Sequence, residues 1–124
     1  MKGFAQREAE SKKMLDKYTD KLPIYLQSKS INLGKNKWLV PRNITSIELI
    51  GFLRKKISIK EHQSIFLYIN TLDSKDNIVN SVLPVPTESM EDVYYNNKND
   101  DGFLYISVEL ETTFGARVEF CEKC

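Results

Sequence analysis

The chain has 124 residues, of which 41% are hydrophobic and 28% are charged, and its formal net charge is +1. This length predicts one domain with a single modest core, and no apolar run approaches the roughly 20 residues that a membrane-spanning helix needs. The N-terminus lacks the charged, then apolar, then small-residue order of a secretory signal, so we expect a cytoplasmic protein.

Charge is distributed unevenly along the chain. Residues 1–62 contain 14 Lys and Arg against 6 Asp and Glu, a net charge of +8, whereas residues 63–124 contain 4 against 11, a net charge of −7. This asymmetry suggests a basic surface offered to acidic partners, and solvated charged faces are an equally good explanation. The short basic run Arg54–Lys56 is too small to predict a nucleic-acid interface, so we expect no nucleic-acid partner.

The first part of the chain predicts a helix followed by two strands. Over residues 4–18, the side chains near one stripe of an amphipathic helix are Phe4, Ser11, Met14, Leu15 and Tyr18. Residues 22–27 and 37–41 are short β-type runs, separated by a polar loop that contains Gly34. We expect these two strands to pair antiparallel.

A central helix is predicted after the second strand. Residues 45–48, Thr-Ser-Ile-Glu, form a capping-box pattern, and apolar residues at helical spacing continue to Ile57. The basic run Arg54–Lys56 suits the negative C-terminal end of the helix dipole. Gly51 inside this helix costs about 1 kcal/mol relative to alanine, so we expect another group to approach it closely.

The second half of the chain predicts two more strands and a short helix. Residues 64–70 are almost continuously apolar and indicate a central strand. Residues 71–82 are mostly polar and predict a mobile loop, with an extra strand or hairpin at a sheet edge as the alternative. A short helix is expected near Thr87, and a last strand over residues 103–110. This order favours an α+β fold with a four-stranded mixed sheet on a central helix.

Recognisable catalytic and metal-binding motifs are absent from the sequence. His62 is the only histidine and has no nucleophile beside it in a known pattern, so we interpret it as a surface or helix-end residue. Cys121 and Cys124 lack the further ligands that a structural zinc site needs. We therefore expect no enzyme activity, metal or cofactor, and a small redox or metal protein that uses the two cysteines is an alternative.

Phe114-Gly115 follows the last predicted strand. Because glycine has no Cβ, the backbone there can thread a narrow enzyme cleft, and cleavage after Gly115 would leave an unhindered carboxylate. A turn glycine before a frayed tail is the alternative interpretation.

Seven segments occur in an order and spacing typical of one family. They are Arg7-Glu8-Ala9-Glu10-Ser11, Leu22-Pro23-Ile24, Lys37-Trp38-Leu39-Val40-Pro41, Leu53-Arg54-Lys55-Lys56-Ile57, Ile65-Phe66-Leu67-Tyr68-Ile69-Asn70, Asp101-Gly102-Phe103-Leu104-Tyr105 and Thr113-Phe114-Gly115. Together they resemble the autophagy ubiquitin-like modifiers, the family of microtubule-associated protein light chain three and the GABA-receptor-associated protein. The spacing differs across residues 71–82, which exceed the family loop by roughly ten residues, an addition that surface loops tolerate.

The resemblance implies a ubiquitin-like β-grasp domain with an N-terminal helical extension over residues 1–115 and a C-terminal tail, residues 116–124, that processing removes. A cysteine protease would recognise Phe114 and cleave after Gly115, and activating and conjugating enzymes would then join this glycine to phosphatidylethanolamine. The protein would be a substrate rather than a catalyst, cytoplasmic and then bound to the autophagosome membrane. The alternative is a peptide-binding adaptor of the same fold that is never conjugated.

The resemblance also implies that receptor and adaptor peptides of the pattern aromatic-x-x-aliphatic add a strand beside residues 37–41. An edge strand suits this role, because its main chain can pair while alternate side chains line pockets on either side. The aromatic pocket would comprise Glu10, Met14, Pro23, Tyr25, Lys37, Leu39 and Phe103. The aliphatic pocket would comprise Trp38, Val40, Pro41, Ile44, Leu49 and Phe52, with ordinary core packing as the alternative for the last three. Basic residues including Lys21, Lys37 and Lys56 would attract an acidic flank of the peptide.

Overall fold

The computed structural model describes residues 3–29, 31–57 and 63–112. Its elements are α1 (Phe4–Lys17), β1 (Lys21–Gln27), β2 (Lys37–Pro41), α2 (Ser46–Lys56), β3 (Gln63–Leu72), β4 (Ile78–Val82), α3 (Met90–Asn97) and β5 (Leu104–Thr112). The short helix predicted near Thr87 starts later, because the Ser89 side chain caps it by accepting a hydrogen bond from the Asp92 N–H. His62, Phe114, Gly115, Cys121 and Cys124 lie outside the described residues.

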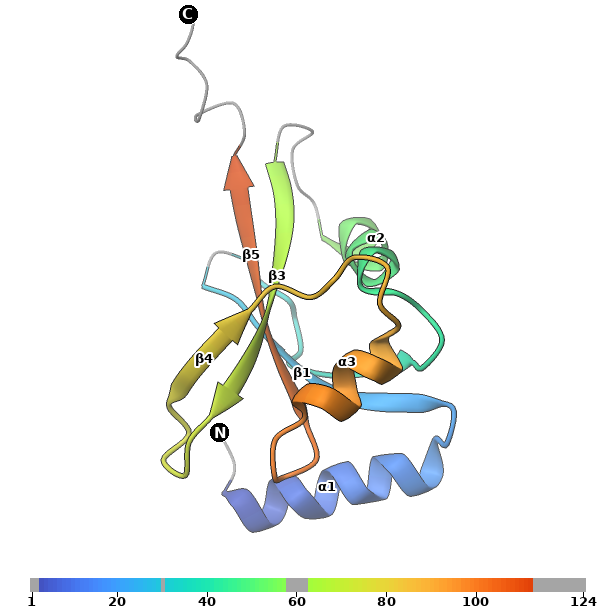
Figure 1. Cartoon of the computed structure of the whole chain (residues 1–124), viewed down its shortest axis with the longest axis vertical. Helices are drawn as coiled ribbons and strands as arrows, with labels where there is room; N and C mark the ends of the chain where they lie inside the picture. Colours follow the sequence, from blue (N-terminus) through green and yellow to red (C-terminus); the bar gives the residue numbers. More distant parts are fainter. Residues whose placement is uncertain (1–2, 30, 58–62, 113–124) are drawn as a thin grey trace, which may run out of the picture.

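The strands form one mixed sheet in the order β2-β1-β5-β3-β4 (Figure 1). β1 pairs parallel with β5 and antiparallel with β2, and β3 pairs antiparallel with both β5 and β4. The α+β class is confirmed, but the sheet has five strands in the described part of the chain rather than the predicted four. β5 is the central strand, and its first residues, Leu104 to Ile106, are buried on both faces, whereas Ser107 and Glu109, like Phe66 and Tyr68 of β3, are partly exposed.

The additional strand comes from residues 71–82. β3 is longer than predicted, and β4 returns antiparallel beside its end after a tight turn. In the turn, the Asp73 carboxylate accepts hydrogen bonds from the N–H groups of Lys75 and Asn77, both at 2.9 Å. The expected loop is therefore a hairpin, the alternative that the sequence also allowed. The polar turn residues in the middle of the segment made the whole segment look like a loop. Its end nevertheless contains three β-branched residues of β4, which favour extended backbone.

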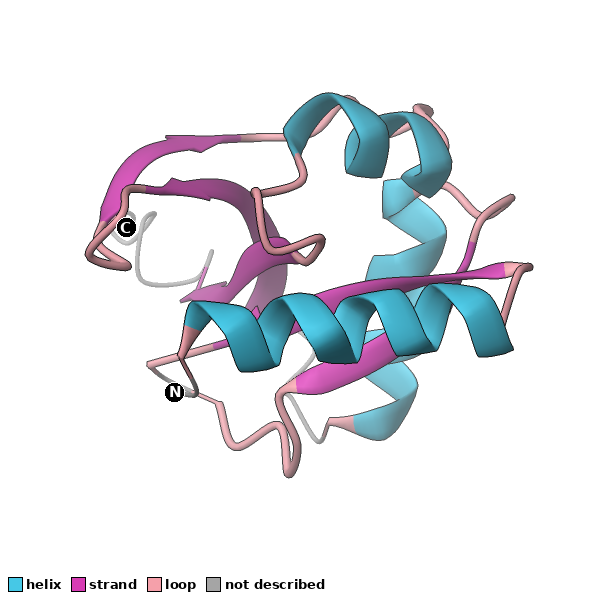
Figure 2. Cartoon of the chain, turned by 90° about the horizontal axis from the view of Figure 1, so that it is seen from below, coloured by secondary structure: helices cyan, strands magenta, loops and turns pink. Residues whose placement is uncertain are grey.

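Helices cover both faces of the sheet, with α2 and α3 on one side and α1 on the other (Figure 2). The core lies on the α2 and α3 side, where alternate residues of β1, β3 and β5 meet Leu49 and Leu53 of α2 and the buried residues of α3. This packing anchors the neighbouring strand β2 through Val40, which is also buried in the core. The position of β2 relative to α2 is therefore set by the core.

α2 begins at the predicted capping box. Thr45 Oγ1 accepts a hydrogen bond from the Glu48 N–H at 3.2 Å, and the Glu48 carboxylate accepts one from the Thr45 N–H at 3.0 Å. This reciprocal pair satisfies two N–H groups that have no partner within the helix. The expected close approach at Gly51 is wrong, because no described heavy atom outside the local helix backbone lies within 4 Å of the position that a Cβ would take.

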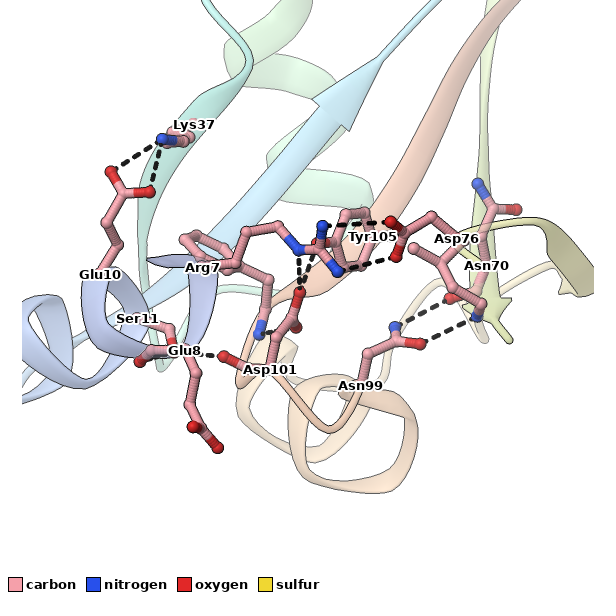
Figure 3. A network of polar contacts seen from close by, with 12 residues as sticks. Arg7, Glu8, Glu10, Ser11, Lys37, Asn70, Asp76, Asn99, Asp101 and Tyr105 are labelled. Atoms are coloured by element: carbon pink, nitrogen blue, oxygen red, sulfur yellow. Dashed lines mark hydrogen bonds and ion pairs between the residues drawn. The ribbon is translucent and has the colours of Figure 1, made fainter. Parts of the chain in front are cut away.

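α1 uses only the middle of the stripe that the sequence suggests: Ser11 is buried, Met14 and Leu15 are half-buried, and Arg7 joins them. Phe4 is 48% exposed and Tyr18 lies beyond the end of the helix, whereas Arg7 and Ser11 are only 4% and 2% exposed. These two polar side chains bond to Asp101, 94 and 90 residues further along the chain (Figure 3). Hydrophobic periodicity does not show that Arg7 belongs to this face, because Arg7 is polar and its partners are distant in sequence.

Candidate functional site

A groove of about 430 Å³ lies where the edge strand β2 meets α1 and α2. It is lined by Met14, Lys21, Lys35, Lys37, Trp38, Leu39, Val40, Pro41, Ile44, Leu49, Phe52, Leu53 and Lys56. β2 is the last strand on its side of the sheet, so its outer main-chain groups face no other strand within the described residues. The groove thus combines apolar side chains, cationic side chains and a free strand edge.

All six residues expected in the aliphatic pocket line this groove. Two of them, Leu49 and Phe52, come from α2 and differ in burial. Leu49 is 3% exposed and belongs to the core, whereas Phe52 is 47% exposed and presents much of its ring to solvent. Core packing and groove lining are therefore combined at Leu49, while Phe52 offers apolar surface to a ligand.

Three of the seven residues expected in the aromatic pocket also line the groove, namely Met14, Lys37 and Leu39. Lys37 joins α1 to β2, because its Nζ donates hydrogen bonds to both carboxylate oxygens of Glu10 at 2.8 Å (Figure 3). Glu10 itself is therefore beside the groove rather than among the residues that line it. The contact closes the α1 end of the groove.

The other three residues expected in the aromatic pocket do not line the groove and lie on β1 and just before β5. Pro23 and Tyr25 on β1 stand opposite Leu39 and Lys37 in the antiparallel register. Phe103 is fully buried just before β5, beside Tyr105, at 6.4 Å between ring centroids. The residues that the family resemblance implies therefore lie in one contiguous region. Residues of β2 line the groove, β1 lies next to β2 in the sheet, and β5 lies next to β1.

Two lysine side chains lie over the ring of Trp38, a contact that the sequence did not predict. The Nζ atoms of Lys35 and Lys56 lie 5.0 Å and 5.6 Å from the centre of its ring. The indole N–H donates to the main-chain oxygen of Lys35 at 3.0 Å. A cation–π contact at an exposed site contributes about 0.5–1 kcal/mol, so these contacts favour one orientation of the ring. Lys35 had no sequence signal, because it stands in an irregular polar loop before β2.

Residues 3–29, 31–57 and 63–112 contain neither a cluster of metal ligands nor a membrane-spanning helix. Among them, no three or more His, Cys, Asp or Glu side chains are grouped so that they could hold a metal ion. None of the helices in this part of the chain is long and apolar enough to cross a membrane. The groove, by contrast, has the geometry for binding an extended chain by main-chain pairing.

A mixed sheet in the order β2-β1-β5-β3-β4, packed on α2 and preceded by a helix, defines a ubiquitin-like protein with an N-terminal helical extension. The family model described as "Autophagy protein Atg8 ubiquitin like" matches residues 6–115. The chain belongs to this Atg8 family of autophagy ubiquitin-like modifiers. The β-grasp fold and the family that the sequence resembles are both confirmed.

Relatives of known name cover most of the chain. It is 35% identical over 117 residues to autophagy-related protein 8e of Arabidopsis thaliana, covering 91% of this chain and 88% of that protein. It is 33% identical over 116 residues to autophagy-related protein 8 of Coccidioides immitis, with 90% and 91% covered. These similarities extend over the groove and its supporting strands.

Solved structures agree with this assignment. The crystal structure of Trypanosoma brucei ATG8 superposes with a TM-score of 0.72 at 27% identity and covers 90% of each chain. Plasmodium falciparum Atg8, solved in complex with a Plasmodium falciparum Atg3 peptide, gives a TM-score of 0.67 at 25% identity and covers 85% of this chain and 88% of that one.

Proposed function

We propose that this autophagy protein binds receptor and adaptor peptides of the pattern aromatic-x-x-aliphatic along the outer edge of β2. The observation that carries the proposal is the groove itself, in which a free strand edge lies between side chains of α1 and α2. A bound peptide would add a sixth strand, with its aromatic side chain near Met14 and its aliphatic side chain near Phe52. The solved complex of Plasmodium falciparum Atg8 with an Atg3 peptide supports peptide binding in this family and makes an Atg3-type peptide a candidate ligand.

Four lysines line the groove, and because Glu10 offsets the charge of Lys37, the net positive charge of the groove comes from Lys21, Lys35 and Lys56. This charge favours peptides with acidic residues before the aromatic position. Because such exposed charges act over a distance, they accelerate encounter more than they strengthen the final complex. The apolar side chains therefore supply most of the affinity, and the lysines bias the choice of partner.

Calorimetric titration with a Trp-x-x-Leu peptide that carries acidic residues before the Trp tests peptide binding. Leu39→Ala should weaken binding by a few kcal/mol at most, the range for truncating an interface anchor. Val79→Ala is the matched control, because Val79 is an exposed aliphatic residue on β4. Failure of the wild-type chain to bind, or equal affinity of a correctly folded Leu39→Ala variant, would argue against this groove.

We further propose that a cysteine protease cleaves the chain after Gly115 and that activating and conjugating enzymes join this glycine to phosphatidylethanolamine on autophagosome membranes. Residues 1–115 would be the modifier and residues 116–124 the removed tail. Two observations support this division. The family match ends at residue 115, and three residues after the end of β5 at Thr112 can span roughly 10 Å, enough to reach an enzyme cleft.

The conjugation proposal is tested with a Gly115→Ala variant, the matching protease and a reconstituted conjugation reaction. Processing and the lipid-linked form should both be lost, because a side chain at this position would obstruct the cleft and the transfer. Peptide binding should be retained, since the groove lies elsewhere. Normal trimming and lipid attachment of the variant would contradict the proposal, and an intact tail in cells would favour the unconjugated adaptor.

A further inference from the structure

The turn of the β3–β4 hairpin presents a carboxylate to α1. Asp76 has a φ of 65°, in the left-handed region that Asn and Asp adopt more readily than most residues. The turn that holds it is closed by hydrogen bonds from the Asp76 N–H to the Asp73 carbonyl at 3.0 Å and from the Asp73 N–H to the Asn77 carbonyl at 2.9 Å. The Asp76 side chain points from this turn toward the guanidinium of Arg7 (Figure 3).

Arg7 is held from two sides. Its Nη2 and Nη1 donate to the two carboxylate oxygens of Asp76 at 2.7 and 3.3 Å, and its Nε donates to Asp101 at 2.9 Å. Burial lowers the pKa of the Arg7 guanidinium, but the hydrogen bonds to Asp101 and Asp76 outweigh burial and leave it above its ordinary value. The guanidinium therefore stays charged, and a forked pair of bonds to one carboxylate fixes its direction as well as its distance.

Asp101 is already engaged on the sheet side. One of its carboxylate oxygens accepts a hydrogen bond from the Phe103 N–H at 2.9 Å, and the other accepts one from the Tyr105 hydroxyl as well as from Arg7. Asp76 thus supplies the second carboxylate that the buried guanidinium meets. Among the bonds within the described residues, Asp76 is the only residue of the hairpin turn that contacts Arg7.

α1 connects this anchor to the groove. Arg7 is followed by Glu10 and Met14, three and seven residues later, so the three side chains share one face of the helix. Glu10 pairs with Lys37 of β2, and Met14 lines the groove. Because a short helix moves as a rigid body, a shift at Arg7 displaces Met14, which lines the groove, and Glu10, which holds Lys37 beside it.

We infer that Asp76 is a positioning residue for the peptide groove: the hairpin carboxylate holds Arg7, and thereby sets the distance of α1 from β2. The apolar contacts of α1 are limited, since its two fully buried side chains are Arg7 and Ser11. Its placement therefore depends on polar bonds, of which the pair with Asp76 is one. The inference rests on the proposed peptide-binding function of the groove.

Asp76→Asn in the full chain tests the inference, because asparagine tolerates the same φ and removes only the charge and one acceptor. In the free protein, hydrogen exchange of α1 amides should become about twofold to fivefold faster, the effect of losing a partly exposed ion pair, while exchange in α2 stays unchanged. Affinity for the acidic Trp-x-x-Leu peptide should fall by a similar factor. Asp100→Asn is the matched control, since Asp100 lines the cavity beside the hairpin turn together with Asp76 and Arg7, but no bond between Asp100 and Arg7 is found within the described residues.

A double-mutant cycle with Met14→Ala separates positioning from a general loss of stability. If Asp76 acts through α1, Asp76→Asn should change peptide affinity much less in the Met14→Ala background than in the wild type. Equal effects in both backgrounds, or unchanged α1 exchange, would overturn the inference. Failure of the wild type to bind the peptide would instead refute the proposed function, and the exchange measurement would still decide whether Asp76 holds α1.

Discussion

Gly102 lies in the turn where the start of β5 meets α1. Its φ is +89°, and a Cβ added there would lie 2.3 Å from Ser11 Oγ. We expect Gly102→Ala to destabilise the fold by about 2–4 kcal/mol, because backbone strain and the conflict with Ser11 act together. Gly34→Ala is the control: its φ is +77°, but no described atom beyond its chain neighbours lies within 4 Å, so it should cost about 1–2 kcal/mol. Urea unfolding measures both, and equal losses would show that the contact with Ser11 has no effect.

Tyr94 is buried on α3, and its hydroxyl donates to the main-chain oxygen of Gly102. Burial raises the pKa of Tyr94 to about 12, above its ordinary value of 10.0. Its stabilising contribution is therefore complete below pH 10 and is lost as the pH rises toward 12. We expect Tyr94→Phe to be about 1 kcal/mol less stable than the wild type at pH 8, the value of one hydrogen bond. Urea titrations should show a smaller difference at pH 11, and a constant difference would refute this account.

At the scale of elements, β4 is attached to the sheet only at the end of β3. It pairs with residues 69–72, and all five of its residues are exposed. We therefore expect the domain to fold cooperatively when residues 74–81 are replaced by two glycines. The loss of stability should be about 1–2 kcal/mol, because the bonds of Asp76 to Arg7 and of Ser81 to Asn70 disappear while Arg7 keeps Asp101 and the apolar core is unchanged. Thermal unfolding of the shortened chain would contradict this expectation if it were no longer cooperative.

Secondary structure was predictable where the signal was local. The capping box at residues 45–48 predicts the start of α2, and the β-type run over residues 37–41 has the same bounds as β2. Ser11 was placed on the buried face of α1, but the burial of Arg7 was not predictable, because its charge is buried only through Asp101 and Asp76. Burial of such side chains depends on partners that a local pattern does not contain.

At the scale of the whole molecule, the charge asymmetry of the sequence places basic and acidic side chains at different sites, the groove and the hairpin turn. The cationic side chains of the groove all come from residues 1–62. The cavity beside the hairpin turn is lined by Asp73, Asp76, Asp100 and Asp101 from the second half of the chain, with Arg7 among them. We therefore expect an acidic peptide to be attracted to the groove and repelled from the hairpin side.

This separation predicts a strong salt dependence of association. For the acidic Trp-x-x-Leu peptide, the association rate should fall about tenfold between 20 and 500 mM salt, while the dissociation rate changes little, because screening acts on the encounter between exposed charges. Stopped-flow measurements with a peptide whose acidic residues are replaced by Ser provide the control. A salt effect carried mainly by dissociation would instead place the acidic residues in direct, desolvated contact with the lysines.

The sequence alone determined the family, the class of fold and the strand along which the groove runs, because capping, alternation and ordered motifs are properties of contiguous residues. The resemblance to the family also pointed to residues that surround one groove. Only the tertiary structure decided that residues 71–82 complete the sheet, that Gly51 is unobstructed and that Asp76 meets Arg7. These features depend on distances between segments that are far apart in the chain, which pairing across the sheet and packing of α1 establish.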